Sequence, residues 1–309
     1  MESLDEFSVI REYFSGLSRG KATIIGPGDD CAVLRLPAET ELATSSDTLI
    51  EGSHFPVGSS GADIAYRAIA TSASDLAAMG AQPLASVLSL SLPDINATWL
   101  EDFRRGLSSA IQCFSLPLVG GDLTAGPLTI SVTVYGGLPI GQALLRSGAR
   151  QGEMVLVSGT LGDAAAGLAF LNKEWEPDCA DKEFLVRRFF RPESRLNLAA
   201  SLLEVATAAI DISDGLLADV GHIASESELA IEIDANKIPF SPALSKLDNR
   251  QQVLNWALSG GDDYELCFTM PASKKVPDGC TPIGFTASGT GVSCEGFDIL
   301  SSKKGYRHF

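Results

Sequence analysis

The sequence lacks most of the short motifs that indicate a known chemistry. It contains no GxxxxGK(S/T) stretch, which argues against a P-loop nucleotide-binding protein. The glycine-rich loop, HRD and DFG motifs of protein kinases are absent, as is a Rossmann fingerprint between a strand and a helix. There are three histidines, with no HExxH pair and no evident Ser-His-Asp arrangement. These absences direct attention to the acidic residues.

Cysteines are few and unpaired along the chain. None of the six forms a CxxC pair, so neither a zinc site nor a disulfide framework is predicted, and a reducing compartment fits. We interpret them as small buried hydrophobic residues. The first residues show no basic segment followed by an apolar one, and no apolar run reaches the length of a membrane-spanning helix. We therefore expect a cytoplasmic protein.

Positive charge is scarce. The chain has 23 Lys and Arg residues against 39 Asp and Glu, a net charge of -16. This argues against binding to a nucleic-acid backbone or to an anionic membrane surface, since both need a basic face. Acidity by itself is explained by solubility. An acidic protein that handles phosphates, however, needs divalent cations between its carboxylates and the phosphate oxygens.

Length and pattern predict two domains of mixed α/β or α+β class. With 309 residues, 45% of them hydrophobic, the chain is long for one core, and strands alternate with helices in both halves. A polar, turn-rich stretch places the boundary near residue 148, giving domains 1–148 and 149–309. The expected helices are 3–14, 61–79, 95–113, 193–206 and 215–225, with a further helix opened by 159–163. The expected strands are 31–34, 41–45, 84–90, 128–135, 153–158, 208–211, 229–234, 265–269 and 281–285.

Aspartates recur at turns and strand ends beside small residues. They are Asp29, Asp30, Asp47, Asp75, Asp122, Asp211, Asp214, Asp262 and Asp263. Each alone is explained as a turn residue or a helix cap, an interpretation we adopt for Asp94 and Asp163. Asp75 is different, because it lies in an Ala-rich helix with no Lys or Arg within one turn, where an unpaired carboxylate is costly. From chemistry alone, a multi-carboxylate metal site and scattered caps are both open.

The residues next to these acids suit magnesium and phosphate. Mg²⁺ prefers oxygen ligands, and hydroxyls or carbonyls of Ser45 and Ser46 could complete a shell beside Asp47. Glycines next to the acids allow phosphates to approach backbone N–H groups. His54 follows the Asp47 segment closely and is a candidate substrate contact.

Eight stretches, in this order, resemble the thiamine-monophosphate kinase family. That family shares an ATP-binding superfamily with aminoimidazole ribonucleotide synthetase and selenophosphate synthetase. The stretches cover nearly the whole chain and are specific as a set. They are GPGDDCAVL (26–34), SSDTLIEGSHF (45–55), ASDLAAMGAQP (73–83), VGGDLT (119–124), LLRSGAR (144–150), DISDGLLADVGHI (211–223), SGGDDYEL (259–266) and GYRHF (305–309).

The resemblance implies a fold and a set of site residues. The fold is a two-domain synthetase-like α/β (α+β) fold, in which the N-terminal ATP- and Mg-binding domains of a homodimer form a barrel-like sheet. The implied Mg²⁺ ligands are Asp30, Ser45, Ser46, Asp47, Asp75, Asp122, Asp211 and Asp214. The implied ATP contacts are Gly121, Asp122, Arg146 and Ser213, and the implied contacts to thiamine monophosphate are His54, Asp262 and Tyr306. Asp30, Asp47, Asp75, Asp122 and Arg146 are implied to act in catalysis.

Two of these residues depart from the family pattern. Asp262 stands where the family usually has Glu, which shortens the implied substrate contact but keeps its charge, and Ser46 stands where Thr is common. The expected reaction is transfer of the γ-phosphoryl group of ATP to thiamine monophosphate, direct and in line, with several Mg²⁺ ions and no phosphoenzyme. The alternatives are another ATP-dependent enzyme of the same superfamily and a non-catalytic nucleotide-binding protein.

Overall fold

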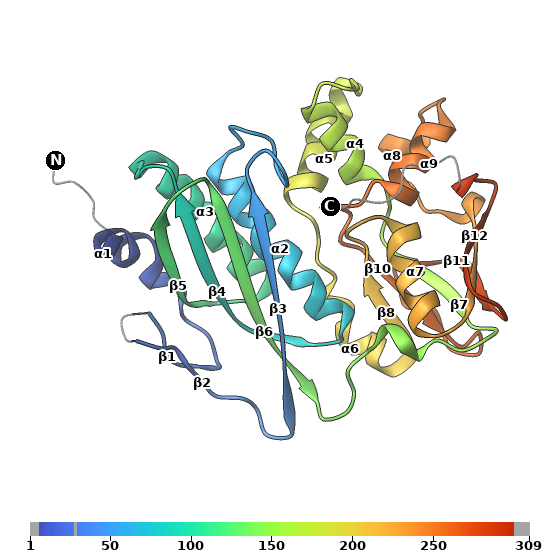
Figure 1. Cartoon of the computed structure of the whole chain (residues 1–309), viewed down its shortest axis with the longest axis horizontal. Helices are drawn as coiled ribbons and strands as arrows, with labels where there is room; N and C mark the ends of the chain where they lie inside the picture. The colour runs from blue at the N-terminus through green and yellow to red at the C-terminus, as the bar shows by residue number, and fades with distance from the viewer. Residues whose placement is uncertain (1–5, 28–29, 300–309) are drawn as a thin grey trace. The chain divides into compact units, whose positions relative to one another are not determined.

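The computed structural model describes residues 6–27 and 30–299, in which strands and helices alternate along the chain (Figure 1). By their contacts they divide into two units: Met1–Leu76 with Ala81–Gly141, and Ala77–Gly80 with Gln142–Phe309. The predicted mixed α/β, two-domain fold is confirmed. Within the described residues, no helix has the length and apolar character needed to cross a membrane.

A four-stranded sheet with the order β3-β6-β4-β5 forms the body of the first unit. Its strands are β3 (Thr40–Ile50), β4 (Gln82–Leu92), β5 (Leu118–Ala125) and β6 (Thr129–Pro139). β4 and β5 run parallel, whereas β6 is antiparallel to both β3 and β4. The sheet ends on β3 at one edge and β5 at the other. Each of these two edge strands carries predicted site residues.

Two long helices, α2 (Gly61–Ala78) and α3 (Ala97–Phe114), cover one face of this sheet (Figure 1). Alternate residues of β6 define the two faces, because successive side chains of a strand point in opposite directions. Ile130, Val132 and Val134 are buried, while the residues between them are partly exposed. The helices meet closely at Gly106, where a Cβ would lie 2.0 Å from the carbonyl oxygen of Ala62.

The N-terminal segment adds small elements to this unit. α1 (Glu6–Val9) continues through a π turn, Ile10–Phe14, into a 3-10 turn, Ser15–Leu17, in place of the single helix predicted over 3–14. β1 (Thr23–Ile25) and β2 (Val33–Leu34) then pair as a short antiparallel sheet. Tyr13 and Phe14 are buried, and Phe14 packs edge-on against Phe103 of α3.

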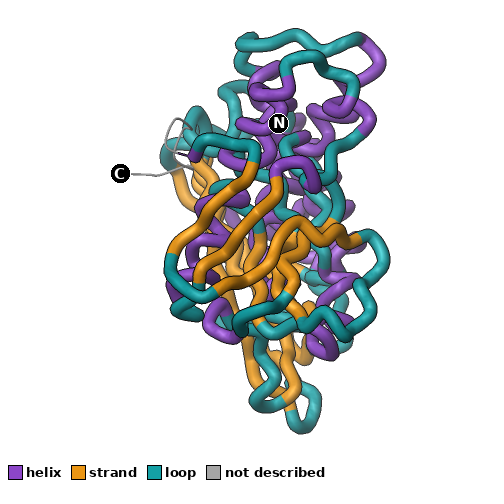
Figure 2. Tube along the Cα trace, turned by 90° about the vertical axis from the view of Figure 1, so that its right-hand side faces the viewer, coloured by secondary structure: helices purple, strands orange, loops and turns teal. Residues whose placement is uncertain are grey.

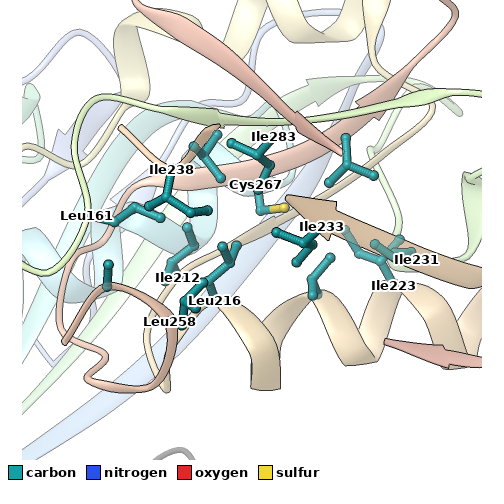
Figure 3. Packing of buried hydrophobic residues seen from close by; sticks show 14 of the residues in the cluster. Leu161, Ile212, Leu216, Ile223, Ile231, Ile233, Ile238, Leu258, Cys267 and Ile283 are labelled. Atoms are coloured by element: carbon teal, nitrogen blue, oxygen red, sulfur yellow. The ribbon is translucent and has the colours of Figure 1, made fainter. Parts of the chain in front are cut away.

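The second unit is built on a six-stranded sheet with the order β12-β9-β11-β7-β10-β8. Its strands are β7 (Met154–Ser158), β8 (Ala208–Asp211), β9 (Ala230–Asp234), β10 (Leu266–Met270), β11 (Cys280–Ala287) and β12 (Gly291–Glu295). Neighbours are antiparallel except β9 and β12. One face packs into a core that includes Ile212, Leu216, Ile231 and the Cys267 thiol (Figure 3).

The second unit also contains helices, and helices and strands both occur throughout the described chain (Figure 2). They are α4 (Asp163–Leu171), α5 (Cys179–Phe190), α6 (Leu196–Val205), α7 (Leu216–Glu226), α8 (Pro242–Ser245) and α9 (Arg250–Ser259), with 3-10 turns η3 (Arg146–Gly148) and η4 (Ala235–Lys237). The predicted helices at 193–206 and 215–225 correspond to α6 and α7. α5, α8, α9, β1, β5 and β12 were not predicted.

Candidate functional site

A cavity of about 700 Å³ lies in the first unit between the β4–β5 edge of the sheet and the N-terminal segment. Its wall on the sheet side includes Gly120, Gly121 and Asp122 of β5, and its opposite wall includes Pro27 and Asp30. Asp30 and Asp122 are both exposed. The structure therefore brings the predicted ligands Asp30, Gly121 and Asp122 to one cavity, whose remaining lining is largely apolar.

A second group lies where β3 meets α2. Alternation along β3 directs Ser45 and Asp47 toward the helix, and the Ser45 hydroxyl donates to Oδ2 of Asp75 at 2.5 Å. Burial raises the pKa of Asp47 above its usual value, while a hydrogen bond from Ser72 and the nearby His54 act in the opposite direction. The Ser45 hydroxyl thus joins one carboxylate of α2, and the half-buried Asp47 lies on the same face of β3, where a cation would stabilise its charged form.

The ring of His54 is oriented by the backbone of the same strand. The N–H of Ile50 donates to its Nδ1 at 3.0 Å, so the neutral ring carries its proton on Nε2. His54 is half buried and follows β3 in a short turn. Asp47 therefore has a ring N–H donor in its neighbourhood, and the role of His54 as a substrate contact stays a prediction.

The sheet separates other predicted ligands from this group. Ser46 points to the opposite face, where its hydroxyl lies 2.9 Å from that of Thr133. Asp122 of β5 pairs with Ser89 of β4. Its neighbour Gly121 lies in the same cross-strand row as Asp47, and the three strand spacings between β3 and β5 amount to about 14 Å. In residues 6–27 and 30–299, no three His, Cys, Asp or Glu side chains gather as a metal-binding cluster.

In the second unit, two loops bring together residues from distant parts of the sequence. β8 ends at Asp211, the loop after it holds Ser213 and Asp214, and the loop before β10 holds Asp262. The two loops extend the β8–β10 ladder: the N–H of Asp262 donates to the Ser213 carbonyl at 2.9 Å, and Tyr264 N–H donates to the Ile212 carbonyl at 2.9 Å. Asp211 is buried, whereas Ser213, Asp214 and Asp262 are half buried.

The backbone at Asp262 has an unusual conformation. Its φ is +63°, in the left-handed region that non-glycine residues rarely adopt, and Tyr264 follows with a φ of +51°. The Tyr264 hydroxyl lies 3.3 Å from Oδ1 of Asp262 and donates to it. Such conformations persist where the surroundings impose them, which is typical of binding loops. Tyr306, the third predicted substrate contact, lies outside the described residues.

Asp219 of α7 was not predicted as a site residue, yet it contacts the first of these loops. It is 2% exposed, and its Oδ2 accepts backbone N–H bonds from Ser213, Asp214 and Gly215 at 3.0, 3.1 and 3.1 Å. Burial and the neighbouring Asp214 raise the pKa of Asp219 to about 7, against the effect of the three backbone donors. The sequence signal that could have identified Asp219 is its position four residues after Gly215, in the first turn of α7.

Arg146 lies in the short η3 turn and is exposed. Ser227, which follows α7, fixes this turn: its hydroxyl donates to the Arg146 carbonyl at 2.8 Å and accepts from the Ala149 N–H at 3.2 Å. The backbone is thus held while the guanidinium extends into solvent. An exposed guanidinium on a held backbone is suited to contact a phosphate.

Behind the Asp262 loop lies a buried ionic network that sequence patterns did not predict. Glu265 is 1% exposed and accepts from Arg195 Nε and Nη2 at 2.5 and 2.6 Å, from Arg188 Nη2 at 3.0 Å and from the Ser158 hydroxyl at 2.5 Å. Asp263 is 1% exposed, accepts from the Gly162 N–H at 2.8 Å, and has a pKa raised well above the usual value by burial.

Asp163 completes this network and differs from the simple cap that was predicted. It is fully buried at the start of α4 and accepts hydroxyl bonds from Thr160 at 2.6 Å and Ser241 at 2.5 Å. Arg188 Nε lies 3.8 Å from its Oδ2. Asp163 is therefore tied to the core of the unit, and its first-turn position alone could not reveal this.

Comparisons with known proteins show which sequences and structures the chain is similar to. Residues 28–138 match the family model described as AIR synthase related protein, N-terminal domain. The chain is 42% identical to the thiamine-monophosphate kinase of Escherichia coli K12 over 98% of both chains. It is similar to the crystal structure of thiamine-monophosphate kinase from Stenotrophomonas maltophilia, with a TM-score of 0.84 and 42% identity over 89% of this chain and 92% of that one. It is also similar to AaThiL complexed with AMPPCP and TMP, with a TM-score of 0.81 and 34% identity over 89% of each chain.

Proposed function

Because the chain belongs to the thiamine-monophosphate kinase family, we propose that it transfers the γ-phosphoryl group of ATP directly to thiamine monophosphate, giving thiamine diphosphate and ADP. The observation that carries this proposal is the cavity lined by Asp30, Gly121 and Asp122. Its volume of about 700 Å³ lies within the usual range for small-molecule sites. The structure of AaThiL with AMPPCP and TMP supports the same pair of substrates.

Magnesium fits the chemistry of the residues present. Asp47 and Asp75 offer carboxylate oxygens beside the Ser45 hydroxyl, and burial disfavours the charged form of Asp47 until a cation is near. Asp30 and Asp122 at the cavity, and Asp211 and Asp214 in the second unit, are further oxygen donors. Ser46 can contribute its carbonyl, since its hydroxyl points to the other face of β3. When bound, Mg²⁺ neutralises charge on the phosphate oxygens.

The protein residues bind and orient the two substrates. The acceptor is a phosphate that is already ionised at neutral pH, so it needs little help from a general base, and positioning provides most of the catalysis. We expect Gly121, Asp122 and Ser213 to hold ATP, with Arg146 supplying a fixed positive charge. His54 would donate from Nε2 to thiamine monophosphate, and Asp262 and Tyr306 would complete that contact.

A homodimer is the second part of this proposal. The first unit exposes large apolar side chains at Ile24, Ile25, Val33, Leu42 and Ile50, the last two on the sheet face away from α2. A second subunit that packs on the open face of the sheet would cover these apolar side chains. We propose that the four-stranded sheets of two subunits pair there as a barrel-like sheet. Light scattering coupled to gel filtration tests this, and a monomer at micromolar concentration would contradict it.

Product analysis tests the activity. The protein is mixed with Mg·ATP and thiamine monophosphate, with free thiamine in a parallel reaction. Thiamine diphosphate formed only from the monophosphate is the expected result, since the acceptor must be a phosphate. No product in either reaction, with nucleotide still bound, would instead indicate another enzyme of the superfamily or a binding protein. Labelled protein after rapid mixing with γ-labelled ATP would contradict direct transfer.

A further inference from the structure

The backbone of residues 213–215 wraps around a single carboxylate oxygen. Oδ2 of Asp219 accepts the N–H groups of Ser213, Asp214 and Gly215 at 3.0–3.1 Å, and the side chain is 2% exposed. Successive N–H groups that converge in this way form a concavity that commonly binds phosphate. Here the protein fills the concavity with its own carboxylate. These three N–H groups are therefore committed to the fold, and only side chains of the loop can reach a ligand.

The same loop is held from its other side by the segment before β10. The N–H groups of Asp262 and Tyr264 donate to the carbonyls of Ser213 and Ile212, both at 2.9 Å. At Gly261 a Cβ would lie 2.4 Å from the Ser213 carbonyl oxygen, so the two backbones touch. Asp219 binds the N–H side of the loop and the 261–264 segment binds its C=O side. This leaves the loop little freedom to rearrange.

We propose that Asp219 is a positioning residue for nucleotide binding. By fixing the 213–215 backbone, Asp219 presents the side chains of Ser213 and Asp214 to Mg·ATP without a loss of loop entropy on binding. This role rests on the proposed function. The competing explanation is that Asp219 only stabilises the first turn of α7. That explanation predicts lower stability and unchanged nucleotide affinity when Asp219 is altered.

The variant Asp219→Asn separates the two explanations. Asparagine keeps the size and one acceptor oxygen but removes the charge, and hydrogen bonds to a charged acceptor are roughly twice as strong as neutral ones. Titration calorimetry with Mg·AMPPCP measures affinity without turnover. We expect the Kd to rise about tenfold, which corresponds to about 1.4 kcal/mol. The KM for thiamine monophosphate should change less than this Kd.

Asp234→Asn is the matched control. Asp234 also accepts a backbone N–H, from Asn236 at 2.9 Å, and lies in the same unit at the end of β9, away from the two loops. Its replacement should leave the Kd for Mg·AMPPCP unchanged. If Asp219→Asn lowers the melting temperature but keeps the wild-type Kd, or if both variants weaken binding equally, the positioning role is wrong.

Hydrogen exchange of the wild-type protein supplies a readout that needs no variant. The amides of Ser213, Asp214 and Gly215 should exchange slowly in the absence of nucleotide, because Asp219 already holds them. Rapid exchange that slows only on adding Mg·AMPPCP would overturn the proposal. Wild-type protein that binds Mg·AMPPCP but forms no thiamine diphosphate would refute the proposed function and leave the role of Asp219 standing.

Discussion

Replacing Glu265 with glutamine should destabilise the second unit by several kilocalories per mole. Glu265 is 1% exposed, and its two oxygens accept four bonds: two from Arg195, one from Arg188 and one from the Ser158 hydroxyl, at 2.5–3.0 Å. Glutamine fits the same space, so it creates no cavity. Its amide group, however, turns two N–H donors toward guanidinium groups that are themselves donors only. The variant therefore leaves buried positive charge without its partner.

The magnitude follows from that loss. Removing one partner of a buried ion pair typically costs about 3–5 kcal/mol. The low end applies here, because Arg195 keeps Glu193 at 2.8 Å and Arg188 keeps the Thr160 carbonyl at 3.3 Å. For a unit of this size, 1 kcal/mol shifts the melting temperature by about 2–4 °C. We therefore expect a fall of about 6–12 °C, measured by calorimetry at pH 7.

Glu193→Gln is the control, because Glu193 pairs with the same arginine in a different setting. Its side chain is 64% exposed, and exposed ion pairs contribute about 0–1 kcal/mol. Its melting temperature should fall by about 4 °C at most, and added salt should remove much of that difference. Equal shifts for Glu193→Gln and Glu265→Gln would refute the reasoning, since burial would then make no difference.

Three further predictions concern the two units separately. Gly121→Ala should abolish nucleotide binding and reduce stability, because a Cβ there would lie 1.9 Å from a carbonyl oxygen of β4. The control is Gly120→Ala, whose Cβ meets only a side chain at 4.0 Å and which should bind AMPPCP normally in calorimetry. Asp75→Asn should lower kcat/KM by about 100-fold or more as a lost metal ligand, while Asp63→Asn on the same helix stays near wild type; equal activities would contradict a metal role. Burial raises the pKa of Asp263 in the folded protein. Its favourable contribution to the free energy of unfolding is therefore complete below the usual Asp pKa and is lost as the pH rises through the raised pKa. Urea unfolding at pH 5 and pH 8 should thus show wild type losing stability relative to Asp263→Asn as the pH rises, and parallel curves would refute this assignment.

The electrostatic surroundings of Asp263 determine the sign of that pH effect. Arg188 lowers its pKa, as does the Gly162 N–H, while Asp163 and Glu265 raise it together with burial. Burial has the largest effect, and Oδ1 of Asp263 has no hydrogen-bond partner. An asparagine at this position has no charge to desolvate. It should therefore be favoured at the pH where the aspartate would otherwise ionise.

Elements with strong local signals could be predicted from sequence. The helix predicted over 61–79 is α2, Gly61–Ala78, because an Ala-rich run is bounded by glycines at both ends. The strand predicted over 208–211 is β8, Ala208–Asp211, whose residues are all buried. In both cases the local pattern and the tertiary environment favour the same conformation.

Other elements were missed where candidate site residues interrupt the hydrophobic pattern of a strand. β3 was predicted to end at residue 45 but continues to Ile50. The prediction stopped early because Ser45 and Asp47 occupy positions facing α2 that a strand usually fills with apolar side chains. β5 was not predicted, since the adjacent Gly120, Gly121 and Asp122 are more typical of a turn. These strands carry candidate ligands, so departures from strand chemistry coincide with the site.

Motifs identified the types of residue in the candidate site but not their neighbours. Ser45 and Asp75 are 30 positions apart, and Arg195 and Glu265 are 70 apart, yet each pair is joined by hydrogen bonds. Adjacent residues can also diverge: Ser45 and Ser46 point to opposite faces of β3. Contacts between distant segments depend on the packing of whole elements, and a single sequence carries no local signal for them.

Burial of a carboxylate does not by itself identify a ligand-binding residue in this protein. Glu265 is buried and is compensated by two guanidinium groups, so it has a complete structural explanation. The pKa of Asp47 is also raised by burial, but a serine hydroxyl and a nearby histidine are what oppose this effect. One hydroxyl bond and one nearby histidine compensate a carboxylate less than two guanidinium groups in direct hydrogen-bonded contact do. The difference in compensation, rather than in exposure, is why Asp47 is the stronger candidate to bind a cation.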